Sequence, residues 1–124
     1  MPRVLVQVAA APLDPPVSSA LEAEGIELIP CHDAYALLEA VMLRLPDAVV
    51  YALRADCGED LGVLRLMRRV APDVPLVLLA AEDSLETRKR TQALRPTYYA
   101  VSPVDGAELR DVVRAVVSKR GRMA

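Results

Sequence analysis

Short apolar segments alternate along the chain with segments whose apolar residues recur every three or four positions. The nearly continuous apolar runs are rich in β-branched residues and cover 4–10, 26–29, 48–53, 76–80 and 97–101. Such runs are typical of strands that are buried on both faces of a parallel sheet. Strands that alternate with helices in this way predict an open α/β sheet with helices on both faces.

Helical spacing marks the segments between these runs. The clearest apolar stripe consists of Leu109, Val112, Val113, Val116 and Val117. Two further stripes consist of Leu37, Leu38, Val41, Met42 and Leu45, and of Val63, Leu64, Met67 and Val70 before Pro72. A shorter helix is predicted to bury Val17, Ala20 and Leu21 and to end at Gly25. Each stripe predicts a helix with one face against the sheet.

The helix predicted over 84–94 differs from the others because it has little apolar face and carries Arg88, Lys89 and Arg90 in a row. We expect it to pack weakly and to be among the most mobile parts of the fold. Asp83 or Ser84 is predicted to cap it, as Asp33 is for the second helix.

Composition fits one domain over residues 1–124, since 53% of the residues are hydrophobic and one core is enough for this length. The net charge of −2 does not favour nucleic acid, and we interpret the basic segment 119–122 as a solvated helix end. The amino-terminal apolar run is too short to cross a bilayer and lacks a secretory pattern. Cys31 and Cys57 match no metal or redox spacing, so we expect reduced thiols and a cytoplasmic location.

Several local patterns recur in a fixed order along the chain. Pro46-Asp47 leads into the third strand and 71–75 leads into the fourth, while Tyr99 lies three residues before Ser102-Pro103 and 104–109 opens the last helix. With these features the chain resembles the receiver domain of bacterial response regulators over nearly its whole length. The resemblance implies a flavodoxin-like, doubly wound sheet of five parallel strands in three layers, and a role in two-component signal transduction.

The residues that give receivers their chemistry do not carry over. The resemblance places Val8 and Ala9 where the family has two metal-binding acids, and Ala52 where it has the phosphate-accepting aspartate. Ala80 stands in place of a threonine or serine, and Ser102 in place of a lysine. Magnesium needs oxygen ligands, and aspartyl phosphorylation needs a carboxylate nucleophile. We therefore expect a degenerate receiver, or pseudo-receiver, with a small apolar pocket, no metal, no cofactor and no enzymatic activity.

Three alternatives stay open at this point. Loop acids near the same sheet edge could rebuild a cation site, and these are Asp14, Asp56, Glu59, Asp60, Glu82 and Asp83. A second alternative is phosphorylation of another residue, such as Asp56. A third is a protein of a different class, either a small-ligand sensor that uses the emptied pocket or an enzyme that shares only the topology.

The resemblance also points to a face for partners, formed by the fourth helix, the fifth strand and the fifth helix. Its candidate residues are Arg88, Lys89, Arg90, Tyr99, Glu108, Asp111 and Arg114. We expect a signalling protein or a fused effector to bind there, or a second copy of the chain. In a homodimer, Arg90, Arg95, Arg110 and Arg114 would form ion pairs with Glu86, Glu108 and Asp111 across a two-fold axis. Tyr98 and Tyr99 should point to opposite faces of the sheet.

Overall fold

Five strands alternate with five helices in the computed structural model of the chain, which describes residues 2–7, 15–53, 58–101 and 104–123. The strands are β1 (Arg3–Gln7), β2 (Glu27–Cys31), β3 (Ala48–Leu53), β4 (Leu76–Ala80) and β5 (Tyr98–Val101). The helices are α1 (Pro15–Ala23), α2 (Ala34–Leu43), α3 (Gly58–Val70), α4 (Leu85–Gln92) and α5 (Gly106–Met123). This order confirms the element sequence predicted from the hydrophobic pattern.

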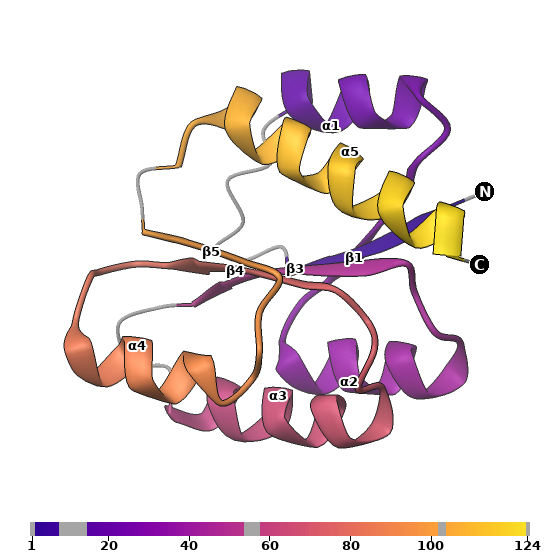
Figure 1. The fold of residues 1–124 in the computed structure, drawn as a ribbon. Helices are drawn as coiled ribbons and strands as arrows, with labels where there is room; N and C mark the ends of the chain where they lie inside the picture. Colours follow the sequence, from indigo (N-terminus) through magenta and orange to yellow (C-terminus); the bar gives the residue numbers. More distant parts are fainter. Residues whose placement is uncertain (1, 8–14, 54–57, 102–103, 124) are drawn as a thin grey trace.

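The strands form one parallel sheet in the order β2-β1-β3-β4-β5. Helices α1 and α5 cover one face of this sheet, and α2, α3 and α4 cover the other (Figure 1). The molecule therefore has the three layers of a doubly wound, flavodoxin-like fold, as predicted. The strand order reverses between β1 and β3, and ligands of such sheets bind at the carboxyl ends of the strands near this reversal.

The sheet separates two apolar clusters, because successive side chains of a strand point to opposite faces. On the side of α2 and α3, Val49, Tyr51 and Leu53 pack with Leu64 and Met67. On the other side, Ala48, Val50 and Ala52 pack with residues of α1 and α5, which include Leu21, Leu109 and Val113. Tyr99 packs against the first cluster and Tyr98 against the second, which confirms that their side chains take opposite faces.

The helix ends follow the predicted capping residues. The Asp33 carboxylate accepts a hydrogen bond from the Ala36 amide at 2.8 Å, and the Ser84 hydroxyl accepts one from the Thr87 amide at 3.0 Å. These contacts satisfy amides that have no partner inside the first turn of a helix. Gly25 follows α1 with a φ of +85°, a conformation that glycine adopts without strain. Among the described helices, none is long and apolar enough to span a membrane.

Part of the predicted core stripe on two helices is wrong. Leu37 and Val41 are buried, but Met42 is 65% exposed, and Leu45, which is 58% exposed, lies beyond the end of α2 at Leu43. On α3, Leu64 and Met67 are buried whereas Val70 is 48% exposed. A helix that lies on a sheet buries only the arc that faces the strands, so apolar residues on its flank remain at the surface.

Candidate functional site

The candidate phosphorylation site lies where β3 and β4 end beside each other. In the parallel register Ala52 lies opposite Leu79, and Leu53 lies opposite Ala80, so the two alanines are one step apart on adjacent strands. Ala52 is 6% exposed and Ala80 is 1% exposed. The ladder continues past them, since the Ala81 amide donates to the Leu53 carbonyl at 3.0 Å.

Two buried methyl groups therefore stand at the carboxyl edge of the central strands. A methyl group supplies neither a nucleophile, nor a metal ligand, nor a hydrogen bond to a phosphoryl oxygen. The other positions of the predicted degenerate site, Val8, Ala9 and Ser102, lie outside the described residues, as do Asp14 and Asp56 of the alternatives.

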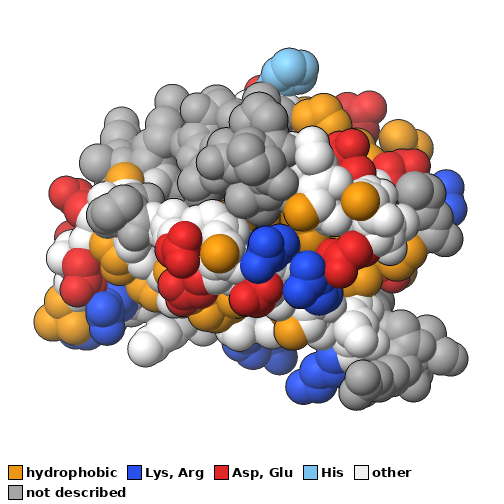
Figure 2. Space-filling view, turned by 90° about the horizontal axis from the view of Figure 1, so that it is seen from above, with side chains coloured by type: hydrophobic (Ala, Val, Ile, Leu, Met, Phe, Trp, Pro, Cys, Tyr) orange, Lys and Arg blue, Asp and Glu red, His pale blue; other side chains and the backbone are white. Residues whose placement is uncertain are grey.

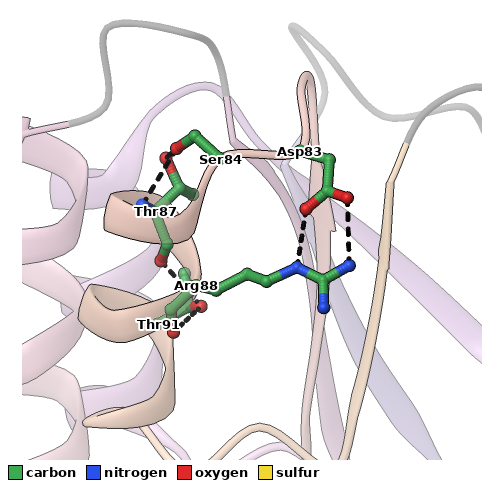
Figure 3. Close-up of polar contacts among 5 residues, drawn as sticks. All are labelled: Asp83, Ser84, Thr87, Arg88 and Thr91. Carbon is green, nitrogen blue, oxygen red and sulfur yellow. Dashed lines mark hydrogen bonds and ion pairs between the residues drawn. The ribbon is translucent and has the colours of Figure 1, made fainter.

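Two of the acidic residues near this edge, Glu59 and Asp83, contact neighbours on the protein. Tyr35 at the start of α2 hydrogen-bonds to Glu59 at the start of α3, which raises the pKa of Tyr35. Asp83 forms a two-pronged ion pair with Arg88, with oxygen–nitrogen distances of 2.6 and 3.2 Å (Figure 3). In the part of the chain that the structure describes, no group of three histidine, cysteine or acidic side chains could hold a metal ion.

Helix α4 begins with a compact set of polar contacts. Figure 3 shows Ser84 above Thr87, whose hydroxyl lies 2.8 Å from the Ser84 hydroxyl. Thr91, the buried residue of α4, donates to the Thr87 and Arg88 carbonyls at 2.9 and 3.0 Å. Local hydrogen bonds of this kind hold the helix in place of an apolar face, and Leu85 at its start is 70% exposed.

Arg88 and Tyr99 of the candidate interaction face lie near each other across α4 and β5. The hydrogen bond to Asp83 and then its charge raise the pKa of Arg88, and Tyr99 adds to the effect. Lys89 is exposed beside Arg88, and Arg90 pairs with Glu86 one turn away at 2.7 Å. On the opposite side of β5, the Tyr98 hydroxyl donates to the Glu108 carboxylate, and this bond, followed by burial, raises the pKa of Tyr98.

The structure does not bring Arg114 together with the rest of this face. Its guanidinium lies 2.8 Å from the Glu24 carboxylate, just after α1, and 3.5 Å from Asp111. Asp111 also lies 3.4 Å from Arg110. Glu108 contacts β5 and Arg114 contacts the α1 side, so the two lie on opposite flanks of α5. Figure 2 looks onto the α1 and α5 layer and shows acidic and basic side chains interleaved there.

No family model matches the chain, but curated proteins and solved structures do. The transcriptional regulatory protein PrrA of Mycobacterium bovis is 28% identical over 123 residues, which cover 99% of this chain and 53% of that protein. The phosphate regulon regulator PhoB of Klebsiella pneumoniae is 27% identical over 124 residues, or 98% of this chain and 54% of PhoB. The chain thus spans about half the length of the curated relatives it matches.

The structural comparison agrees with these sequence matches. The CheY-like receiver domain of Methanospirillum hungatei superimposes with a TM-score of 0.83 at 15% identity, covering 100% of this chain and 99% of that one. The chain has the fold of response regulator receiver domains and is similar in sequence to the regulators named above. The receiver domain of HemR from Leptospira biflexa gives a TM-score of 0.78 at 19% identity, with 95% of each chain covered.

The structure also buries an arginine that the sequence pattern did not indicate. Arg68 is 8% exposed and donates to five backbone carbonyls, those of Leu94 (2.7 Å), Ala71 (3.4 Å), Pro72 (3.3 Å), Val74 (2.5 Å) and Arg95 (3.2 Å). Burial lowers the pKa of Arg68, and the charge of Arg95 lowers it further. The contacts join the α3–β4 and α4–β5 connections at the sheet edge opposite Ala52. The available signal was its position next to Met67 and four residues after Leu64, on the buried side of α3.

Proposed function

We propose that this receiver domain acts in two-component-type signalling without aspartyl phosphorylation, and that it works through protein–protein contact and not through enzymatic activity. In this proposal the α4–β5–α5 face binds a signalling protein or an effector domain, either fused or separate. The curated relatives named above are transcriptional regulators about twice as long as this chain, which supports an effector as the output.

The observation that carries the proposal is the pair of buried alanines at the ends of β3 and β4. Phosphoryl transfer requires an attacking oxygen and a cation that neutralises the developing charge. Ala52 and Ala80 are too buried for a neighbouring loop acid to replace them without moving the strand ends. Asp83 lies three residues after the end of β4, and Arg88 already pairs with its carboxylate.

The character of the α4–β5–α5 face supports a protein partner. Leu85 and Lys89 are exposed on α4, and Tyr99 is half-buried on β5 beside Arg88. An aromatic ring flanked by an arginine is typical of the anchor residues that dominate binding energy at interfaces. The ion pairs predicted across a two-fold axis remain a prediction. Arg90 and Arg114 already pair with Glu86 and Glu24, and an exchange of exposed pairs contributes little.

Intact-mass measurement after treatment with a small phosphodonor and magnesium tests the proposal. We expect no stable or acid-labile mass increase, whereas a receiver that retains the aspartate gains one phosphoryl group under the same conditions. A phosphoryl adduct that disappears in Asp56→Asn would overturn the proposal and establish a displaced acceptor. An adduct that persists in that variant would also overturn it, with tandem mass spectrometry to locate the acceptor.

A further inference from the structure

Helices α2 and α3 expose an apolar surface that the proposed function does not use. Its members are all about half exposed or more and are Tyr35 (59%), Met42 (65%), Leu45 (58%), Leu66 (50%) and Val70 (48%). Single exposed apolar side chains are common, but a contiguous group of them marks an interaction site. Whether these five are contiguous depends on how the two helices lie against each other.

The two helices run side by side and in the same direction, because each connects one parallel strand to the next (Figure 1). The contact between Tyr35 and Glu59 fixes their relative level. Met42 and Leu66 each lie seven residues further along, so equal helical rise brings them to one level. Val70 lies one turn beyond Leu66 at the end of α3, and Leu45 lies two residues beyond the end of α2. The five residues thus form a strip along the outer side of the groove between the helices, which we call the α2–α3 seam.

The packed floor of the seam lies directly beneath this strip. Val63 is buried and Leu38 is partly buried, and both pack against the apolar cluster on this side of the sheet. Gly62 lies on the outer arc of α3, and a Cβ added to it would meet no atom within 4 Å. The seam therefore has raised apolar side chains on either side of a position that has no side chain.

Charges at the two ends of the seam have opposite signs. Asp33, Glu59 and Asp60 lie at the amino-terminal end of the two helices. Arg44 and Arg69 lie at the carboxyl-terminal end and are exposed. A surface that is acidic at one end and basic at the other is complementary to itself when two copies meet in opposite directions.

We infer that a second copy of this chain docks face to face on the α2–α3 seam, with its helices antiparallel to those of the first. The two-fold axis then lies in the interface and crosses the helices at right angles, so that each element meets itself, as a symmetric dimer requires. Glu59 of one copy faces the partner's Arg69, and Leu66 projects over the partner's Gly62. The charge arrangement disfavours a parallel pairing, which would place acid against acid.

The contact is expected to be reversible. The strip is only about 16 Å long between the levels of Glu59 and Val70 on α3, by the rise of a helix. Interfaces below the standard size give weak complexes, so we expect a dissociation constant on the order of micromolar. This inference does not depend on whether the strand ends are phosphorylated.

Sedimentation velocity over roughly 1 µM to 1 mM tests the assignment through a pair of matched variants. Leu66→Glu places a charge in the seam, and we expect it to weaken dimerisation at least about tenfold. Leu85→Glu places the same charge at an exposed leucine on α4, and we expect no change. Both side chains are exposed, so neither substitution empties the core, and circular dichroism verifies that both variants are folded.

Charge reversal tests the antiparallel direction. We expect Glu59→Arg and Arg69→Glu each to weaken the dimer and the double variant to restore much of the affinity, because the two positions face each other across the axis. Losses that simply add would overturn this direction. A monomer throughout the concentration range would overturn the inference. A weaker dimer in Leu85→Glu would also overturn the inference, whether or not Leu66→Glu weakens it too. Unchanged dimerisation in both variants would overturn it as well.

Discussion

Arg88 holds both carboxylate oxygens of Asp83, at 2.6 and 3.2 Å, immediately beyond the end of β4. An acid that follows β4 is well placed to help bind a cation at the carboxyl edge of the sheet. In this chain the Arg88 guanidinium already binds the Asp83 carboxylate. The chain thus combines buried alanines at its strand ends with an acid beside them that already forms an ion pair.

Loss of this ion pair should change stability only slightly. Both side chains are about half exposed, so solvent screens their attraction. We expect Arg88→Ala to lower the free energy of unfolding only slightly in urea denaturation. Lys89→Ala, at the next exposed position, is the control and should change it less. A loss as large as that caused by breaking a buried ion pair would contradict the surface character of this pair.

Substitution of Arg68 should be far more damaging. Arg68→Ala leaves several buried carbonyls without their donor, and we expect a loss of about 2–4 kcal/mol in unfolding free energy. Arg65→Ala and Arg69→Ala remove exposed arginines of the same helix and should stay within about 0.5 kcal/mol of the parent protein. Equal losses of unfolding free energy at all three positions would contradict a stabilising role for the hydrogen bonds of Arg68.

Two glycines should respond in opposite ways to alanine. Gly62 lies inside α3 with open space around it, so Gly62→Ala should raise the free energy of unfolding by about 0.5–1 kcal/mol. Gly25 has a φ of +85°, and Gly25→Ala should lower that free energy by about 1 kcal/mol. Thermal unfolding of both variants measures the difference. Destabilisation by Gly62→Ala would contradict the open surroundings that the structure gives this residue.

Alkaline pH should weaken the contact between β5 and α5. The pKa of Tyr98 is raised above 10.0 in the folded chain, mainly because its hydroxyl donates to Glu108. The folded state therefore binds the phenolic proton more tightly, and this contribution is present below pH 10 and is lost as pH rises through the folded pKa. We expect Tyr98→Phe to flatten the decline of stability above pH 10. An unchanged pH profile in that variant would contradict the role of this hydrogen bond.

The fold was predictable from the sequence because its central strands β3 and β4 are buried on both faces. Runs such as Ala48–Leu53 and Leu76–Ala80 cannot be solvated, and the helices between them fix the parallel topology. The caps Asp33 and Ser84 were predictable for a local reason, since a cap depends only on the residues of its own first turn.

Features that depend on packing between elements were less predictable. The stripe with Met42 and Val70 has helical spacing, but the spacing alone does not show how wide an arc the sheet covers. Arg68 was missed because its partners are backbone carbonyls, which leave no trace in a sequence pattern. The Arg88–Asp83 and Arg114–Glu24 pairs depend on side-chain directions at helix ends. For the candidate site, the sequence alone indicated that Ala52 and Ala80 stand at the strand ends. The extent of their burial became known only with the register of β3 against β4.

An amide NMR titration with magnesium, followed by beryllofluoride, tests the loss of phosphorylation chemistry most directly. We expect no saturable shifts for the amides of Ala52, Ala80 and their strand neighbours, while a receiver that retains its aspartate responds under the same conditions. Saturable shifts at these strand ends would show that a working acceptor site persists, and would contradict the loss of phosphorylation chemistry.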